Sequence, residues 1–230
     1  MAFALAADDH KQLERPLSAA LAALCLHADI EQRGRLLRYV SLLKRWNAIH
    51  NLSATRDASE LLQHHVIDCL AIVPSLTRHA QGRPLAALDA GTGAGLPAVV
   101  IAIMLPAWEV AAVDAVGKKV AFLRQAGGEL GLRNLHPQHI RLESMAIAGH
   151  GFDVVTARAF SSLAEFVRRT GHLIDPSGIW MAMKGKLPET EIRDLPADCQ
   201  LFHVERLTVP GLGAERCLVW IKPARQNAPQ

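Results

Sequence analysis

An acidic residue followed by three alternating glycines is the pattern in this chain most able to hold a ligand. Residues 85–97 run from an apolar, strand-like segment through Asp89 into Gly91, Gly93 and Gly95. A glycine turn between a strand and a helix lets a ligand approach bare backbone, and the free N–H groups of the helix start favour negative charge. A carboxylate at the strand end would repel the pyrophosphate of a dinucleotide. A ligand with both an ammonium and a carboxylate fits better, and S-adenosylmethionine (SAM) is such a ligand.

Other ligands of glycine-rich turns fit this spacing less well. The nicotinamide fingerprint G-x-G-x-x-G/A can be placed on Gly93, Gly95 and Ala98, but it then starts late and includes Pro97. When the fingerprint is placed on Gly91 and Gly93, it does not match, because its third glycine position is Leu96. No G-K-S/T motif follows, which disfavours a nucleotide triphosphatase. A turn without any ligand is also disfavoured, because three alternating glycines cost chain entropy.

Further candidates lie at the predicted carboxyl ends of strands, where open doubly wound sheets bind their ligands. Asp114 ends the second predicted strand, where a carboxylate can accept hydrogen bonds from ribose hydroxyls; a turn or capping acid is the alternative. Leu142 and Glu143 end the third, where an apolar side chain can cover an adenine ring and polar groups can bond its exocyclic nitrogen. These positions predict that an adenosyl group lies beside the glycine turn.

The fourth predicted strand ends in Ala157-Arg-Ala-Phe160, which has chemical consequences. Many enzymes that methylate exocyclic amines carry Asp/Asn-Pro-Pro-aromatic at this point. Its replacement indicates no general base, and hence an acceptor atom with a free lone pair and no proton to lose, such as N7 of guanine. Catalysis then depends on alignment of the reacting atoms. Arg158 is the candidate for positioning, through guanine O6, a phosphate or the cofactor, and a surface ion pair is its alternative role.

Scattered basic residues usually mark a solvated surface. The predicted fold nevertheless brings Arg141, Arg158 and Lys184 to the rim that carries the cofactor. A cationic rim around a methyl donor suits a phosphate-bearing substrate, so nucleic acid is favoured over a small molecule. His64 and His65 are not a metal pair, because neighbours on a helix point to different faces. A hydrogen bond along the helix between His65 and Asp68 is the simpler expectation.

These residues need a particular scaffold. Up to about residue 80 the apolar spacing is helical, residues 81–84 resemble a linker, and strands then alternate with helices. We expect a Rossmann-like α/β methyltransferase fold with a seven-stranded, mostly parallel sheet that ends in an antiparallel hairpin. The predicted units are an N-terminal helical extension (1–80), a SAM-binding domain (81–225) and a tail (226–230). The predicted strands are 85–90, 109–115, 135–143, 152–159, 178–184, 201–209 and 215–222.

Composition limits the class of protein. The chain has 230 residues, half of them apolar, and a net charge of +3, which permits a nucleic-acid partner without requiring one. Its four cysteines form no C-x-x-C pair, so we expect reduced thiols and no metal site. The short apolar start lacks a basic leader, and no apolar run is long enough to span a bilayer. We expect a soluble cytoplasmic protein with no membrane contact and no obligate protein partner.

Eight short motifs together resemble one bacterial family, RsmG (also called GidB). They occur in family order over nearly the whole chain, which is more specific than any single motif. The motifs are Trp46-Asn47, Asn51-Leu-Ser-Ala-Thr-Arg56, His65-Val-Ile-Asp68, Leu88-Asp-Ala-Gly-Thr-Gly-Ala-Gly-Leu-Pro97, Gly117-Lys-Lys-Val-Ala-Phe-Leu123, Ala157-Arg-Ala-Phe160, Met183-Lys-Gly185 and Gly213-Ala-Glu-Arg216.

The resemblance implies an enzyme that transfers methyl from SAM to N7 of a guanine in small-subunit (16S) ribosomal RNA. Two positions depart from the family's usual residues: Ala115 replaces a serine or threonine, and Ala98 replaces a glycine. The resemblance implies SAM contacts at Gly91, Leu96, Leu142, Glu143 and Arg158, and RNA-facing positions at Lys118, Arg141, Lys184 and Arg216. The partner it implies is ribosomal RNA or the small ribosomal subunit.

Three other functions remain open from the residues themselves. A small-molecule methyltransferase would share the cofactor site. A non-catalytic RNA-binding or ribosome-assembly module would keep the fold and lose SAM affinity. A nicotinamide dehydrogenase ranks last, because its fingerprint fits poorly. The oligomeric state and the role of the N-terminal helices are left open.

Overall fold

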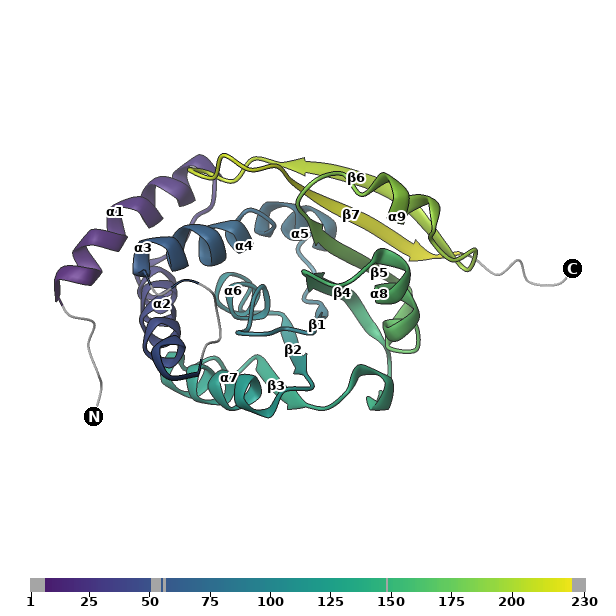
Figure 1. Ribbon diagram of the computed structural model, residues 1–230, viewed down its shortest axis with the longest axis horizontal. Helices are drawn as coiled ribbons and strands as arrows, with labels where there is room; N and C mark the ends of the chain where they lie inside the picture. Colours follow the sequence, from purple (N-terminus) through teal and green to yellow (C-terminus); the bar gives the residue numbers. More distant parts are fainter. Residues whose placement is uncertain (1–6, 51–54, 56, 148, 225–230) are drawn as a thin grey trace, which may run out of the picture.

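The computed structural model describes residues 7–50, 55, 57–147 and 149–224, with side chains from residue 12 onward. The predicted tail at 226–230 and most of the motif at 51–56 lie outside these residues. The centre of the molecule is a seven-stranded sheet with strand order β3-β2-β1-β4-β5-β7-β6 (Figure 1). Its strands are β1 (Ala86–Ala90), β2 (Glu109–Asp114), β3 (Leu135–His139), β4 (Phe152–Arg158), β5 (Ile174–Lys184), β6 (Cys199–Leu207) and β7 (Arg216–Pro223).

The strand directions confirm the predicted fold class. The first five strands pair in parallel, while β7 lies antiparallel to both β5 and β6. The order of the parallel strands reverses at β1, which places the ends of β1 and β4 at a switch point where open sheets bind ligands. The residues after β1 therefore lie where a ligand site is expected.

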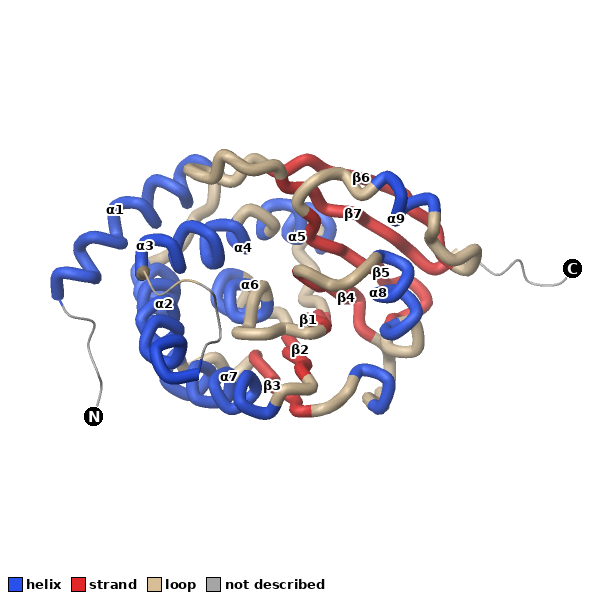
Figure 2. The backbone as a smooth tube through the Cα atoms, in the orientation of Figure 1, coloured by secondary structure: helices blue, strands red, loops and turns tan. Residues whose placement is uncertain are grey.

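Helices cover both faces of the sheet. Figure 2 shows α1–α7 on one side of the strands and α8 and α9 on the other. The helices are α1 (Ala7–Ala23), α2 (Ile30–His50), α3 (Ala58–Leu61), the π-helix η1 (Leu62–Ile67), α4 (Asp68–Leu70), α5 (Val73–Ala80), α6 (Ala98–Met104), α7 (Gly117–Leu130), the 3₁₀-helix η2 (Leu142–Ser144), α8 (Leu163–Thr170) and α9 (Glu189–Arg193).

Alternating strand residues supply two separate cores, because successive side chains on a strand point to opposite faces. On β1, Ala87 joins the core under α1–α7, whereas Leu88 and Ala90 join the core under α8. The first core also takes in buried residues of α2 such as Leu36 and Leu43. The N-terminal helices thus bury their apolar faces against the same layer as α6 and α7.

The third strand is shorter than predicted. The sequence was expected to run as strand from 135 to 143, but β3 ends at His139 and residues 142–144 form η2. A strand would leave Leu142 and Met145 on opposite faces, since they are an odd number of residues apart. The 3₁₀ turn, with the Met145 amide donating to the Leu142 carbonyl, buries both beneath α8. Leu142 and Glu143 therefore sit on a turn beyond the strand end.

Candidate functional site: a glycine turn between two cavities

The turn after β1 has a backbone that favours glycine at three positions. Gly91, Gly93 and Gly95 have φ of 69°, 63° and 95°, in the left-handed region that L side chains rarely adopt. A Cβ on Gly95 would lie 2.2 Å from Leu123 and 2.8 Å from Val99, so this glycine lets the turn pack on the helices behind it. A Cβ on Gly91 or Gly93 would meet nothing closer than 3.8 Å. Those two glycines leave bare backbone open on the outer side.

Asp89 lies beneath this turn and is only 1% exposed. Its Oδ2 accepts hydrogen bonds from the Thr92 hydroxyl (2.6 Å) and from the Ala98 amide (3.0 Å). The carboxylate therefore ties the turn to the start of α6. Burial raises its pKa from 3.8 to about 6, although both hydrogen bonds act to lower it. Its other oxygen, Oδ1, is buried without a hydrogen-bond partner among the described residues.

Two cavities meet at Gly91. The larger, of about 720 Å³, is bounded by the turn, by the ends of β4, β5 and β7, and by residues of η1 and α4. The smaller, of about 150 Å³, is bounded by the ends of β2 and β3 and by the ring of Phe160. One elongated ligand could pass over Gly91 and enter both cavities.

The sequence-predicted positions divide between these two cavities. Gly91, Gly93, Leu96 and Arg158 line the larger one, and Gly91, Asp114 and Leu142 line the smaller one. The other three predicted cofactor residues, Asp89, Gly95 and Glu143, line neither. Asp89 and Gly95 support the turn from behind, so any charge preference of Asp89 acts across the backbone of the turn.

Asp114 joins the smaller cavity to the turn. Its Oδ2 accepts from the Gly93 amide (3.0 Å), and its Oδ1 accepts from the Val116 amide (2.8 Å). Lys119 approaches the same carboxylate at 3.4 Å. Asp114 is 7% exposed and faces the cavity, so its oxygens can accept further hydrogen bonds there.

The far wall of the smaller cavity consists of Leu142, Phe160 and Arg169. The Arg169 guanidinium lies 5.6 Å from the centre of the Phe160 ring. Glu143 forms an ion pair with Arg169, and the interaction with this guanidinium lowers the pKa of the exposed Glu143 carboxyl. Glu143 is therefore linked to the cavity through an arginine that motif matching did not single out.

Arg158, at the end of β4, is held by the helical part of the molecule. Its guanidinium lies 3.5 Å from the Asp68 carboxylate, donates to the His64 carbonyl (3.3 Å) and lies 3.4 Å from Nδ1 of His65. Burial and the neighbouring Arg158 charge lower the pKa of His65. Asp68 in turn accepts from Nε of Arg216 at 2.7 Å.

The partner expected for Asp68 from the sequence was wrong. The helical spacing predicted a partner one turn away at His65, but the carboxylate pairs with arginines 90 and 148 residues further along the chain. Asp68 is 4% exposed, so it brings two cations of the sheet onto one buried acid of the helical layer. The π-helix η1 just before it fits this placement, because π-turns are frequent at functional sites.

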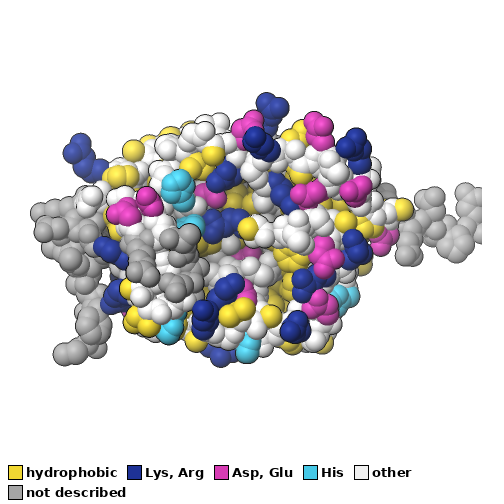
Figure 3. Space-filling model, viewed as in Figure 1, with side chains coloured by type: hydrophobic (Ala, Val, Ile, Leu, Met, Phe, Trp, Pro, Cys, Tyr) yellow, Lys and Arg dark blue, Asp and Glu magenta, His cyan; other side chains and the backbone are white. Residues whose placement is uncertain are grey.

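The expected RNA-facing residues occupy different places. Lys184 and Arg216 line the larger cavity, and Lys184 pairs with Glu191 at 2.8 Å. Arg141 is exposed and lines the smaller cavity, whereas Lys118 donates to the His50 carbonyl at the end of α2. Figure 3 shows Lys and Arg side chains gathered around the hollowed centre of this face. Three of the four predicted cations therefore border the cavities.

Neither a metal cluster nor a membrane helix is found in the described part of the chain. Within it, no three His, Cys, Asp or Glu side chains are grouped so that they could hold a metal ion. None of the described helices has the length and apolar character needed to cross a membrane.

The sheet order, the terminal hairpin and the acid–glycine turn define the class as α/β proteins with the Rossmann-like methyltransferase fold. One solved structure with this likeness is a ribosomal protein L11 methylase from Lactobacillus delbrueckii subsp. bulgaricus, with a TM-score of 0.51. It is 16% identical, and the match covers 69% of this chain and 77% of that one. At this identity the likeness supports the fold alone.

The family itself is shown by sequence. The family model described as rRNA small subunit methyltransferase G (GidB) matches residues 32–219. A relative from Acidovorax sp. (strain JS42) is 49% identical over 91% of this chain and 95% of its own length. One from Methylibium petroleiphilum is 46% identical over 93% and 96%. Both are described as ribosomal RNA small subunit methyltransferase G. The chain belongs to this family of enzymes, which confirms the resemblance drawn from its motifs.

Proposed function

We propose that this protein transfers a methyl group from SAM to N7 of a guanine in small-subunit (16S) ribosomal RNA. The observation that carries the proposal is the acid-supported glycine turn between two cavities, in a chain that belongs to the small-subunit methyltransferase G family. The smaller cavity has the apolar wall and the carboxylate that suit an adenosyl group. The larger cavity has the volume and the cations that suit an amino-acid moiety together with a nucleotide.

The residues present fit SAM as a cofactor. The negative charge of Asp89 lies behind the turn and favours an ammonium group in the larger cavity, and a bound water can supply the donor that its unpartnered Oδ1 needs. Asp114 offers acceptors at the mouth of the smaller cavity for a ribose, and Leu142 offers an apolar surface for an adenine. The cofactor residues in this proposal are Asp89, Gly91, Gly93, Gly95, Leu96, Asp114, Leu142, Glu143 and Arg158.

SAM supplies an electrophilic methyl group on a sulfonium, and the chain's task is to align an acceptor with it. N7 of guanine has a lone pair and loses no proton when it is alkylated, so no general base is needed. Arg158, fixed by Asp68 and His64, can hold guanine O6 or a phosphate without covering N7. The residues then act by orientation, which is worth several powers of ten in rate.

The cations at the cavity mouth support a nucleic-acid substrate. Lys184 and Arg216 border the larger cavity, and Arg141 borders the smaller one. Their positive charge lowers the cost of bringing a phosphate backbone to the site, at an affinity that falls with salt. We include Lys118, Arg141, Lys184 and Arg216 as the RNA-facing residues of the proposal, with free ribosomal RNA or the small subunit as partner.

This role belongs in the cytoplasm, where bacterial ribosomal subunits are made. It needs no metal, no membrane and no obligate protein partner. Residues 81–225 would carry the cofactor and residues 1–80 would form the helical extension.

The test is methylation of small subunits purified from a strain that lacks this modification. Methyl-labelled SAM should place label on one guanine, at N7, in a reaction that high salt suppresses. Label on a metabolite and none on RNA would instead indicate a small-molecule methyltransferase. RNA binding without SAM affinity would indicate an assembly module, and NAD binding without SAM binding would indicate a dehydrogenase.

A further inference from the structure

The glycine turn accepts a hydrogen bond from α2, and the motif of the turn itself does not indicate this contact. The hydroxyl of Tyr39, on α2, donates a hydrogen bond of 2.7 Å to the carbonyl of Ala94. Ala94 lies between Gly93 and Gly95 in the turn, and its half-buried side chain packs against the core under α1–α7. A helix of the N-terminal segment thus contacts the backbone of the turn where it lines the larger cavity.

The other supports of the turn come from the sheet. Asp89 of β1 holds Thr92 and the start of α6, and the Val113 carbonyl of β2 accepts from the Thr92 amide at 2.9 Å. Asp114 holds the Gly93 amide. These bonds fix Thr92, Gly93 and the start of α6. Within the turn, the Gly95 amide donates to the Thr92 carbonyl, and Tyr39 holds the carbonyl of the same Ala94–Gly95 peptide. The flanking glycines have wide conformational freedom, so the position of this middle peptide depends on such a contact.

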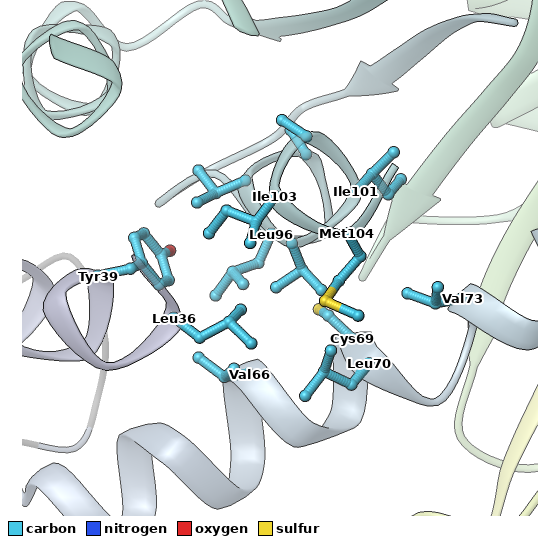
Figure 4. Packing of buried hydrophobic residues seen from close by; sticks show 14 of the residues in the cluster. Leu36, Tyr39, Val66, Cys69, Leu70, Val73, Leu96, Ile101, Ile103 and Met104 are labelled. Atoms are coloured by element: carbon cyan, nitrogen blue, oxygen red, sulfur yellow. The ribbon is translucent and has the colours of Figure 1, made fainter. Parts of the chain in front are cut away.

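The packing around Tyr39 holds its side chain in position for this contact. Its side chain is fully buried, and its ring lies 6.2 Å from that of Phe122 on α7. Figure 4 shows it pointing from α2 toward Leu96 and α6, beside Leu36. Burial raises the pKa of the phenol well above its usual value, so the hydroxyl stays a donor at any working pH. A rigid, buried donor restricts the turn more than a mobile surface group would.

We infer that Tyr39 is a positioning residue for the cofactor site. It holds the middle of the glycine turn in the shape that binds ligand, so α2 is part of the binding machinery as well as a cover for the sheet. Tyr39 lines neither cavity and so acts through the Ala94 carbonyl. The inference rests on the proposed function in that the ligand of the turn is taken to be SAM or its product, S-adenosylhomocysteine.

The physical expectation follows from the unsatisfied carbonyl. Without the hydroxyl, the Ala94 carbonyl loses its partner and the turn gains alternative conformations. Ligand binding must then restrict those conformations again, which weakens affinity. Once the ligand is bound, the reacting atoms are in their usual places. The loss should therefore fall on the binding of SAM and not on the rate at saturation.

The experiment compares Tyr39→Phe with Gln32→Met in the full-length protein. Tyr39→Phe removes the hydroxyl and keeps the ring. Gln32→Met removes two other hydrogen bonds of the same helix: Gln32 Nε2 donates to the Ile103 carbonyl at the far end of α6, and Gln32 Oε1 accepts from the Asp29 amide. Calorimetry with S-adenosylhomocysteine should give a Kd about fivefold higher for Tyr39→Phe and unchanged for Gln32→Met. The KM for SAM should rise in the same proportion, while kcat and small-subunit affinity stay within twofold.

Amide exchange without ligand supplies an independent measurement. The amides of Gly95 and Leu96, which donate to the Thr92 carbonyl, should exchange faster in Tyr39→Phe than in either the wild type or Gln32→Met. Equal Kd values for the wild type and Tyr39→Phe, or equal weakening in both variants, would overturn the inference. So would unchanged exchange at these amides. If the wild type binds no S-adenosylhomocysteine, the proposed function fails, and exchange alone still decides whether Tyr39 holds the turn.

Discussion

The glycine turn and the ion-pair cluster of the larger cavity (Asp68, Arg158 and Arg216) are held together by different kinds of contact. The turn is held by hydrogen bonds that Asp89 accepts from residues 3 and 9 positions along the chain, and by one that Asp114 accepts from a residue 21 positions away. The cluster depends on one acid, Asp68, that pairs with arginines 90 and 148 positions away. The first network is mostly local and buried, and the second is long-range and a quarter exposed at its cations.

This difference has a functional meaning. A turn held by buried carboxylates presents one fixed backbone surface, as a small cofactor of constant shape requires. The two arginines of the cluster are about a quarter exposed, so each can reach a phosphate at the cavity while the buried Asp68 holds it in place. We therefore expect changes in the turn to act on stability and cofactor affinity, and changes in the cluster to act on RNA binding and turnover.

The largest loss of stability should come from adding a side chain at Gly95, on the side of the turn that packs against the helices. Gly95→Ala places a Cβ within 2.8 Å of two side chains at a φ of +95°, and strain and overpacking together should lower the free energy of unfolding by about 4 kcal/mol. Binding of S-adenosylhomocysteine should be lost. Gly93→Ala is the matched control, because its Cβ meets open space, and it should cost only about 1 kcal/mol. Urea denaturation and calorimetry measure both; equal costs would contradict the packing argument.

The buried acid of the turn should give a pH dependence. The pKa of Asp89 in the folded protein is about 6 and its ordinary value is 3.8, so the folded state binds this proton more tightly than the unfolded chain. Stability should therefore fall as pH rises from about 4 to about 6, by up to about 3 kcal/mol. Urea denaturation of the wild type and Asp89→Asn between pH 4 and 8 measures this, since the variant lacks the group. Parallel pH curves for the two proteins would rule out the raised pKa.

The acid of the cluster should act on turnover more than on cofactor binding. Asp68→Asn removes the charge that holds Arg158 and Arg216, and should lower the free energy of unfolding by about 2 kcal/mol, less than for a fully buried pair. Because Arg158 then loses its fixed position, kcat should fall about tenfold, while the Kd for S-adenosylhomocysteine should rise by a smaller factor, because Arg158 is one of nine proposed cofactor residues. Asp194→Asn, at an exposed acid, is the control. A kcat equal to that of the wild type would show that Asp68 does not contribute to turnover.

The smallest effect on stability should accompany a selective loss of RNA binding. Arg216→Gln should weaken small-subunit binding about fivefold and reduce the slope of log affinity against log salt by about 0.7 to 0.9. Lys222→Ala, an exposed cation on the same strand outside both cavities, should change neither quantity. Filter binding over a salt series measures both variants. An unaltered slope for Arg216→Gln would show that this arginine serves only its ion pair.

Much of the fold followed from patterns that are local. Strands β1, β2 and β4 start and end within a residue or two of prediction, because each alternates with a helix and ends at a polar residue or a glycine. The end of β3 was wrong by four residues, because burial of Leu142 and Met145 beneath α8 favours a 3₁₀ turn. Helix α8, which packs on these two residues, is distant in sequence, so no local sequence pattern indicates the turn.

The site divides in the same way. The amino-acid sequence by itself determined the acid–glycine turn, the class of sheet and the family, because glycine at left-handed positions and alternating apolar residues are requirements of the backbone. Only the tertiary structure decided that Asp89 lies under the turn, that Asp68 joins Arg158 to Arg216, and that Tyr39 reaches Ala94. Those contacts depend on how the N-terminal helices pack on the sheet, and packing brings together residues whose separation along the chain carries no periodic signal.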